Sequence, residues 1–394
     1  MATSTGRRAD VAEGLLARMD DWGPEKIVCV SDSRTGMRGV LVLDNTARGS
    51  GKGGTRMSPT LDVDEVARLA RTMTWKWAAT DLFHGGAKAG ILGDPAGPDK
   101  EAVLRAFARA LSNEVPREYV LGLDMGLTER DAAILRDELG DRGAAVGLPS
   151  ALGGVPYDEL GVTGFGLAES AEAAMESQGR RLRGVRVTLQ GFGAVGVAAA
   201  NRLTELGAVV VAVSTGEGAV HDPDGLDVRA LTELRREVGD ACVLRYGARR
   251  LPLGAELTVD TDVLVPAARQ DAIDEEVARR TTATLVVEGA NLPTTPAARA
   301  ILAERDVLVV PDFIANAGGV VAAAFAMDAR YSAFRPDPER ILGSVSEKLR
   351  ANTVRVLEEA LQRGTTPHEA ALALAQDRVR EAMRLRGRLP RHAA

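Results

Sequence analysis

A glycine-rich turn between an apolar run and a helical segment constrains the fold of this chain more than any other feature. The run VRVTLQ (185–190) leads into the turn, and VAAANRL (197–203) follows it. The turn consists of Gly191, Phe192, Gly193, Ala194, Val195 and Gly196. In such a unit the first glycine permits the tight turn, the second lets the backbone approach a pyrophosphate, and the third lets helix pack on strand. We therefore predict that this turn binds a dinucleotide, with its phosphates at the helix N-terminus.

The sequence around this turn repeats an alternation of apolar runs and helical segments. The apolar runs lie at 185–190, 208–214, 262–267, 284–289 and 307–311. Continuous apolar runs are typical of strands in a parallel sheet that is covered by helices on both faces. The alternation therefore predicts a Rossmann-type dinucleotide-binding domain over residues 156–335.

The second apolar run ends without the acidic residue that would bind the ribose of NAD. Ser214 and Thr215 stand there instead, and Glu217 follows in a turn. A missing carboxylate relaxes discrimination against a 2′-phosphate, but no arginine stands immediately beside this pair. We therefore expect NAD or NADP as the cofactor and leave the choice between them open.

Two asparagines follow later strands of the same domain. Asn291 lies just beyond the run at 284–289, and Asn316 lies beyond the run at 307–311. Ligands of open α/β sheets bind at the carboxyl ends of the strands, so both amides are candidates for holding the nicotinamide ribose or carboxamide. The alternative for each is to cap the N-terminus of a helix.

The N-terminal part of the chain is predicted to be a separate α+β domain. Residues 26–45 are typical of two strands joined by a turn, and 62–80 and 99–114 have the apolar spacing of amphipathic helices. The charged C-terminal residues are helical and show no strand pattern. We expect an α/β protein in which a substrate-binding and oligomerisation domain, 1–155, is joined by the C-terminal helices, 336–394.

Three lysines in the N-terminal part are candidates for an anion pocket. Lys88 lies in GGAKAG (85–90), Lys52 in another glycine-rich loop, and Lys76 at the edge of a helix's apolar face. A desolvated lysine has a lowered pKa and can act as a base near neutral pH. Each lysine taken singly is more typical of a surface charge. Asp124 either caps a helix or is a carboxylate partner of the lysines, and its spacing leaves both open.

The overall composition excludes several classes of partner. With a net charge of −6, the 394-residue chain shows no basic surface for nucleic acid or an anionic membrane. Its two cysteines, Cys29 and Cys242, are expected to be reduced thiols in a cytoplasmic protein. The four histidines are too dispersed to predict a metal site, and no run is typical of a signal peptide or membrane span.

The order of these motifs resembles the Glu/Leu/Phe/Val amino-acid dehydrogenase family, and most closely its glutamate dehydrogenases. The resemblance extends over roughly residues 25 to 330. The matching segments are GKGGTRM (51–57), MTWK (73–76), GGAKAG (85–90), LDMG (123–126), TGFG (163–166), QGFGAVG (190–196), VEGANLPTTP (287–296) and FIANAGGV (313–320). It implies an oxidoreductase with a substrate domain, a Rossmann-type domain and a cleft that closes on the substrate. It also implies a homo-oligomer, commonly a hexamer.

The resemblance assigns roles to the substrate-side residues. Lys88 matches the catalytic lysine, and Asp124 matches the aspartate that shuttles protons with it. Lys76 matches the lysine that holds the α-carboxylate, and Lys52 matches the lysine that binds the side-chain carboxylate in glutamate-specific members. The implied reaction is oxidative deamination of an L-amino acid to a 2-oxo acid and ammonia, and its reverse. In it Lys88, kept neutral by its lysine neighbours, deprotonates the attacking water.

The resemblance also assigns cofactor-binding residues, and it shows positions at which this sequence differs from the family's usual residues. Asn291 and Asn316 match cofactor-side asparagines, and Thr163 matches a threonine near the nicotinamide. Ala323 stands where glutamate-specific members have a serine that helps bind the side-chain carboxylate, and His84 where an aromatic or apolar residue is common. Two alternatives therefore remain beside a glutamate-type enzyme. One is a dehydrogenase for an apolar or unusual amino acid of the leucine or valine type, and the other is a non-catalytic regulatory relative that binds nucleotide.

Overall fold

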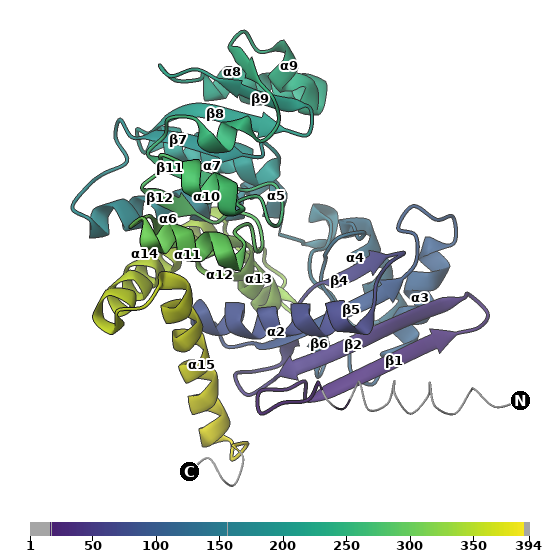
Figure 1. Ribbon diagram of the computed structural model, residues 1–394. Coiled ribbons are helices and arrows are strands. Elements are labelled where there is room, and N and C mark those ends of the chain that lie inside the picture. Colours follow the sequence, from purple (N-terminus) through teal and green to yellow (C-terminus); the bar gives the residue numbers. More distant parts are fainter. Residues whose placement is uncertain (1–15, 17, 156, 390–394) are drawn as a thin grey trace, which may run out of the picture. The chain divides into compact units, whose positions relative to one another are not determined.

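A computed structural model describes residues 16, 18–155 and 157–389 of this chain, which forms two compact units (Figure 1). Unit 1 comprises Met1–Pro156, Ala323–Pro336 and Ala375–Ala394, and unit 2 comprises Tyr157–Ala322 and Asp337–Leu374. Within the described ranges, no helix is both long enough and apolar enough to cross a membrane.

Unit 1 is built on a mixed sheet with helices on both faces. Its described strands are β1 (Lys26–Asp32), β2 (Met37–Asn45), β3 (Gly51–Lys52), β4 (Thr55–Ser58), β5 (Gly85–Leu92) and β6 (Tyr119–Val120). They follow the order β1-β2-β5-β3-β6, with β4 also paired to β5. The strand β2 is antiparallel to β1 and β5, whereas β3 and β4 run parallel to β5.

Alternation along β2 places its apolar side chains on the two faces of this sheet. Val40 and Val42 pack against α2 (Val63–Ala79), and Leu41 and Leu43 belong to the larger core formed with α3 (Lys100–Ala110) and α4 (Glu129–Leu139). The helix predicted over 62–80 is therefore present as α2, capped by Asp62, whose carboxylate accepts the backbone N–H of Glu65.

The glycines around Lys88 are needed for packing inside the protein. A Cβ at Gly86 would overlap the backbone and hydroxyl of Thr74 on α2, and a Cβ at Gly90 would lie 2.5 Å from a methyl group of Leu61. Since no side chain fits there, α2 and the segment before it pack directly on β5. The glycines at 86 and 90 are thus explained by the close packing of neighbouring elements.

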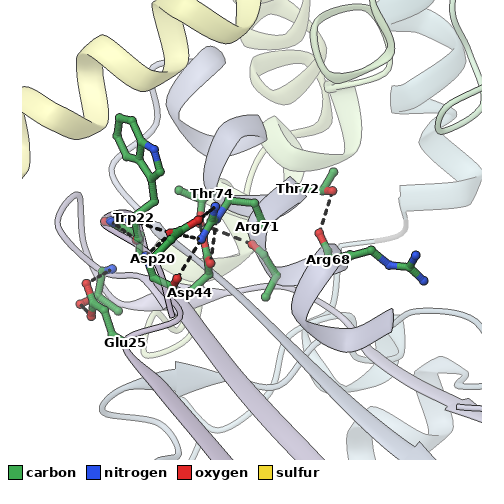
Figure 2. A network of polar contacts seen from close by, with 12 residues as sticks. Asp20, Trp22, Glu25, Asp44, Arg68, Arg71, Thr72 and Thr74 are labelled. Carbon is green, nitrogen blue, oxygen red and sulfur yellow. Dashed lines mark hydrogen bonds and ion pairs between the residues drawn. The ribbon is translucent and has the colours of Figure 1, made fainter. Parts of the chain in front are cut away.

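A buried polar network fixes α2 to the end of β2 (Figure 2). Asp44 is fully buried, and its two carboxylate oxygens each accept a hydrogen bond of 2.9 Å from Nε of Arg71. Thr74 donates to the same carboxylate at 2.6 Å, and Arg71 also bonds Asp20. Burial raises the pKa of Asp44 to about 6, and the charge of Arg71 opposes this rise. The network therefore depends on Arg71 for its charge balance.

Unit 2 contains a twisted sheet whose central strands are parallel. In the described residues its strands are β7 (Arg186–Gln190), β8 (Val209–Thr215), β9 (Gly218–His221), β10 (Arg249–Leu251), β11 (Val263–Pro266), β12 (Leu285–Val287) and β13 (Leu308–Val310). Their order is β10-β9-β8-β7-β11-β12-β13, and β8, β7, β11, β12 and β13 are parallel neighbours. All five predicted runs form strands, which confirms the α/β fold class.

The helices of unit 2 follow its strands as the alternation predicted. They are α5 (Tyr157–Leu160), α6 (Val162–Ser177), α7 (Ala194–Glu205), α8 (Val228–Val238), α9 (Cys242–Arg245), α10 (Glu275–Arg280), α11 (Pro296–Glu304), α12 (Asp312–Ala315) and α14 (Pro338–Arg363). Two further helices, α13 (Gly318–Ala329) and α15 (Pro367–Leu385), contribute residues to both units.

The C-terminal helices divide differently from our expectation. We assigned 336–394 to the first domain, but α14 lies in unit 2, where a Cβ at Gly166 on α6 would meet Leu349 at 2.5 Å. The later part of α15 does belong to unit 1, where Arg378 donates to the carbonyls of Ala78 and Ala79. An amphipathic pattern shows that a helix has a buried face, and it does not specify the domain that covers this face.

Candidate functional site

The candidate catalytic pair is Lys88 and Asp124, which the structure brings together in unit 1. Lys88 lies in the middle of β5, where its side chain is 7% exposed. Its Nζ lies 2.8 Å from Oδ2 of Asp124, which follows β6 in the chain. Asp124 does not cap α4, because Thr128 and Asp131 form the capping box of that helix. Of the two roles left open for Asp124, the structure therefore favours the carboxylate partner.

Arg56 is a member of this cluster that the sequence did not single out. It lies on β4, and its Nε donates to the same Oδ2 of Asp124 at 2.9 Å. Its Nη1 donates to Glu65 at 2.5 Å, so Arg56 is fixed between two carboxylates. The segment GKGGTRM contains Arg56, but an arginine in a short strand carries no spacing signal of its own.

The electrostatics of the pair follow from burial and from Arg56. Burial lowers the pKa of Lys88. The carboxylate of Asp124 raises this pKa, and the positive charge of Arg56 lowers it further. Burial by itself would raise the pKa of Asp124, but Lys88 and Arg56 outweigh it and hold that pKa below its usual value. We attributed a neutral Lys88 to its lysine neighbours, whereas the structure makes desolvation the main cause and Arg56 the principal neighbouring cation.

Lys52 is a second buried amine in the same unit. Its Nζ donates to the carbonyls of Gly53 and Val120, at 3.2 Å each, and a Cβ at Gly122 would overlap it. Burial lowers the pKa of Lys52 to about 7, and the charges of Lys88 and Arg330 contribute. The charge of Lys88 therefore acts on Lys52, and an anion pocket at these two amines stays a prediction.

The rings of His84 and Trp77 pack against each other beside Lys52. The indole Nε1 of Trp77 donates to the carbonyl oxygen of Lys52 at 3.0 Å, and the two rings meet edge to face at 4.9 Å. Burial lowers the pKa of His84 to about 4, with contributions from Lys52 and Arg330. Its Nδ1 is buried and has no hydrogen-bond partner among the described residues. The neutral His84 imidazole therefore has one buried nitrogen whose hydrogen-bonding capacity is unused among the described residues.

The other two predicted substrate residues lie on helices. Lys76 is half-buried in the last turn of α2, one residue before Trp77. Ala323 is half-buried on α13. Lys52, Lys88 and Asp124 are thus joined by contacts and electrostatic interactions, and the position of Lys76 and Ala323 at this site stays a prediction.

The glycine-rich turn in unit 2 has the geometry that a dinucleotide site needs. Gly191 has φ +96°, which favours glycine, and a Cβ at Gly196 would overlap the carbonyl oxygen of Gly191. A Cβ at Gly193, by contrast, would meet nothing within 4 Å. Gly193 caps α7, whose first residues are Ala194 and Val195. The open space at Gly193 fits a pyrophosphate at the helix N-terminus.

The other cofactor residues lie around the same end of the parallel strands. Phe192 is fully buried in the core, and Ser214 and Thr215 end β8. Together with the turn they line a cavity of about 320 Å³. The sequence did not predict Arg235, which comes from α8 and lines this cavity too.

The two predicted asparagines contact each other. Nδ2 of Asn316 donates to Oδ1 of Asn291 at 3.2 Å and to the carbonyl of Gly289. Neither caps a helix N-terminus, since Thr295 caps α11 and Asn316 is the C-cap of α12. Oδ1 of Asn316 is buried without a hydrogen-bond partner in the described chain, so the residue retains an acceptor for a ligand. Thr163 lies near the first turn of α13, as its Oγ1 would be 3.3 Å from a Cβ at Gly319.

Comparison with known families identifies the chain. The model of the Glu/Leu/Phe/Val dehydrogenase dimerisation domain matches residues 24–140, and that of the Glutamate/Leucine/Phenylalanine/Valine dehydrogenase domain matches residues 153–387. The chain belongs to the Glu/Leu/Phe/Val dehydrogenase family. The predicted resemblance is confirmed, and this protein is an NAD(P)-dependent amino-acid dehydrogenase.

Individual relatives cover nearly the whole chain. NAD-specific glutamate dehydrogenase A of Halobacterium salinarum is 35% identical over 89% of this chain and 82% of its own length. NADP-specific glutamate dehydrogenase A1 of the same organism is 36% identical over 83% and 79%. Among solved structures, the hetero-hexameric glutamate dehydrogenase of Thermus thermophilus in its leucine-bound form is 32% identical, with a TM-score of 0.81 and 99% coverage of both chains.

Proposed function

We propose that this family member oxidatively deaminates L-glutamate to its 2-oxo acid and ammonia, and catalyses the reverse reductive amination. The observation that carries the proposal is the buried Lys52 amine, which interacts electrostatically with the Lys88–Asp124 pair. A buried cation that bonds only carbonyl oxygens among the described residues retains the capacity to bind a carboxylate. The substrate's side-chain carboxylate fits that requirement.

Lys88 is the base in this proposal. A bound NAD(P)⁺ would supply the hydride acceptor, and loss of hydride from the α-carbon leaves the substrate as an iminium ion. Lys88 then removes a proton from water as the water oxygen attacks the iminium carbon, and the lowering of the Lys88 pKa by burial favours the neutral amine that this step requires. Asp124 receives the proton through its 2.8 Å contact and returns it to the nitrogen of the carbinolamine. Ammonia then leaves as Lys88, neutral again, removes the hydroxyl proton, which gives the carbonyl group of the 2-oxo acid.

Arg56 positions the pair and does not itself touch the substrate in this proposal. Because it bonds Asp124 and Glu65 at once, it holds the aspartate toward Lys88. Lys76 binds the α-carboxylate and Lys52 the side-chain carboxylate. The methyl group of Ala323 offers no hydrogen bond to that carboxylate.

Unit 2 supplies the cofactor residues in this proposal. The turn from Gly191 to Gly196 holds the pyrophosphate, and Ser214 and Thr215 lie beside the adenosine ribose. Asn291, Asn316 and Thr163 lie at the nicotinamide end. The open space at Gly193 and the unpartnered Oδ1 of Asn316 support this arrangement.

A second candidate substrate is an apolar or unusual amino acid. It is favoured by Ala323 and by the lowered pKa of Lys52, which leaves much of this amine uncharged near pH 7. An uncharged Lys52 accommodates an apolar side chain at a smaller desolvation cost.

An activity matrix of amino acids against NAD⁺ and NADP⁺ tests the proposal. We expect glutamate to be the best substrate and Lys52→Leu to abolish that preference. Conversion of leucine or valine at a higher kcat/KM than glutamate would instead support the second candidate. If no amino acid reduced either nucleotide while nucleotide still bound, the regulatory alternative would be favoured.

The proposal extends to assembly and location. We propose a homo-oligomer, and specifically a hexamer, because a dimerisation-domain model matches residues 24–140 and a Thermus relative is hexameric. Sedimentation of the purified protein measures the subunit number. We also propose a cytoplasmic location, with Cys29 and Cys242 present as separate thiols.

A further inference from the structure

The two hydroxyl groups at the end of β8 already form hydrogen bonds within the protein. Oγ of Ser214 accepts the backbone N–H of Gly191 at 3.1 Å, and Oγ1 of Thr215 donates to the backbone carbonyl of Asp240 at 2.8 Å. These bonds shape the floor of the cavity that contains the glycine-rich turn. The strand end therefore brings no carboxylate to the adenosine ribose, and any charge there comes from another element.

That charge comes from the last turn of α8. The guanidinium of Arg235 lines the cavity beside Ser214, Thr215 and Gly216, and it forms an ion pair with Asp240. Its side chain is 25% exposed, so it is partly shielded but accessible. A Cβ at Gly216 would lie 3.5 Å from Oδ2 of Asp240, which shows how close the ion pair comes to the strand end. Arg235 lies twenty residues beyond Thr215, which explains why the sequence showed no arginine immediately beside this pair.

The charges around this cavity favour an anion. Its charged lining residues are Arg235, Arg269 and Asp240, with a net charge of +1. A guanidinium has five N–H donors in a planar fork, so pairing with one carboxylate leaves donors for a second anion. A neutral ribose diol needs an acceptor, and the backbone carbonyl and Oδ1 of Asp240 already accept hydrogen bonds from Thr215 and Arg235.

We propose that Arg235 recognises the 2′-phosphate of NADP(H), and that Asp240 holds its guanidinium at the mouth of the cavity. The inference rests on the proposed binding of the dinucleotide at the glycine-rich turn. It makes NADP(H) the preferred cofactor of this enzyme and makes Arg235 a specificity-determining residue. Asp240 is a positioning residue, and its negative charge weakens phosphate binding.

Binding of two adenosine nucleotides to the whole enzyme tests this inference without any turnover. The probes are adenosine 2′,5′-bisphosphate and adenosine 5′-monophosphate, which differ by the 2′-phosphate alone. By titration calorimetry we expect the bisphosphate to bind about tenfold to a hundredfold more tightly, as charge-assisted hydrogen bonds typically provide. Equal affinities of the wild type for the two probes would overturn the proposal.

Variants locate the effect at Arg235. Arg235→Ala should reduce bisphosphate affinity to that of the monophosphate and leave monophosphate binding unchanged. Arg236→Ala is the matched control, because it removes the same charge from the next residue, which is exposed and outside this cavity. Arg235→Lys keeps the positive charge but lacks the planar set of guanidinium N–H donors. It should therefore retain part of the preference for the bisphosphate over the monophosphate. If Arg235→Ala kept the full preference with an unchanged melting temperature, Arg235 would not be the discriminating residue.

Asp240→Asn separates the two possible roles of the aspartate. We expect bisphosphate binding to strengthen severalfold, since a repulsive charge is removed. Weaker monophosphate binding, with no gain for the bisphosphate, would instead make Asp240 the ribose acceptor and would contradict the inference. If neither probe bound the wild type, both this inference and the proposed cofactor site would be wrong. Activity with glutamate and both intact cofactors would show whether the proposed reaction fails as well.

Discussion

At the residue scale, the environment of Lys88 determines what its amine can do. Lys88→Gln should lower kcat by about 10²–10⁴-fold, because it removes the proposed base but keeps a polar side chain of similar length. Lys26→Gln is a matched control, since Lys26 is a strand lysine of the same unit whose side chain is 39% exposed in surface ion pairs. Steady-state rates of both variants provide the comparison. A Lys88→Gln enzyme with wild-type kcat would show that another group is the base.

The pH dependence of kcat/KM in an Arg56 variant tests whether Lys88 is the base. With Lys88 as the base, kcat/KM rises with pH as Lys88 loses its proton, with a midpoint below the ordinary lysine pKa of 10.5. Arg56 lowers that pKa, so Arg56→Met should move the midpoint to higher pH. The pH profile of kcat/KM in both proteins measures the shift. An unchanged midpoint would mean that the rise of kcat/KM with pH reflects the titration of a group other than Lys88.

Lys52 makes folding stability depend on pH. Its pKa is about 7 in the folded protein, below 10.5 for an ordinary lysine, so between these values the unfolded chain binds more protons. The free energy of unfolding therefore rises with pH across this window. Lys52→Met should remove that slope and stabilise the protein at pH 7 and below by on the order of a few kcal/mol. Urea unfolding at several pH values measures it, and an unaltered slope would contradict the buried position.

At the element scale, the contact of α2 with β2 depends on one ion pair. Arg71→Met leaves the buried Asp44 carboxylate without its counter-ion, which should cost about 3–5 kcal/mol of stability. Because the pKa of folded Asp44 is raised, folding loses stability as pH rises through about 4 to 6, and the variant should be least affected in acid. Chemical unfolding measures the loss, and Arg68→Met, an exposed arginine on the same helix, is the control. Adding Asp44→Asn should restore much of the loss, and failure to do so would contradict this account.

The elements differ in how well the sequence predicted them. The parallel strands of unit 2 were predictable, because strands covered on both faces are continuously apolar. The short antiparallel strands β9 and β10 were missed, since segments of three or four residues are too short to show a clear alternation. Arg56 and Arg235 were missed for a related reason. Each reaches its partners through tertiary contacts, and sequence spacing does not record such contacts.

At the scale of the whole molecule, the two proposed tasks belong to separate units. Lys88, Asp124 and Lys52 lie in unit 1, whereas the glycine-rich turn and the asparagines lie in unit 2. The sequence predicted this division near residue 155, but it assigned α14 to the wrong unit, because an amphipathic pattern does not specify which core covers the apolar face. The separation means that binding of nucleotide and chemistry at the substrate can be removed independently by mutation.

Two glycines of the same turn are expected to have different roles. Gly193 leaves space for a ligand, whereas Gly196 is needed for the packing of the fold. A Cβ at Gly193 meets nothing within 4 Å, so Gly193→Val should keep the wild-type melting temperature but abolish nucleotide binding by filling the space for the pyrophosphate. Gly196→Ala should instead destabilise the protein, because its Cβ would overlap the carbonyl oxygen of Gly191. Thermal unfolding and NADPH fluorescence titration measure the two effects. The Gly193→Val protein should also retain the rise of stability with pH that Lys52 causes, since Lys52 lies in the other unit. Nucleotide binding by Gly193→Val would mean that this turn serves the fold alone and that the cofactor binds elsewhere.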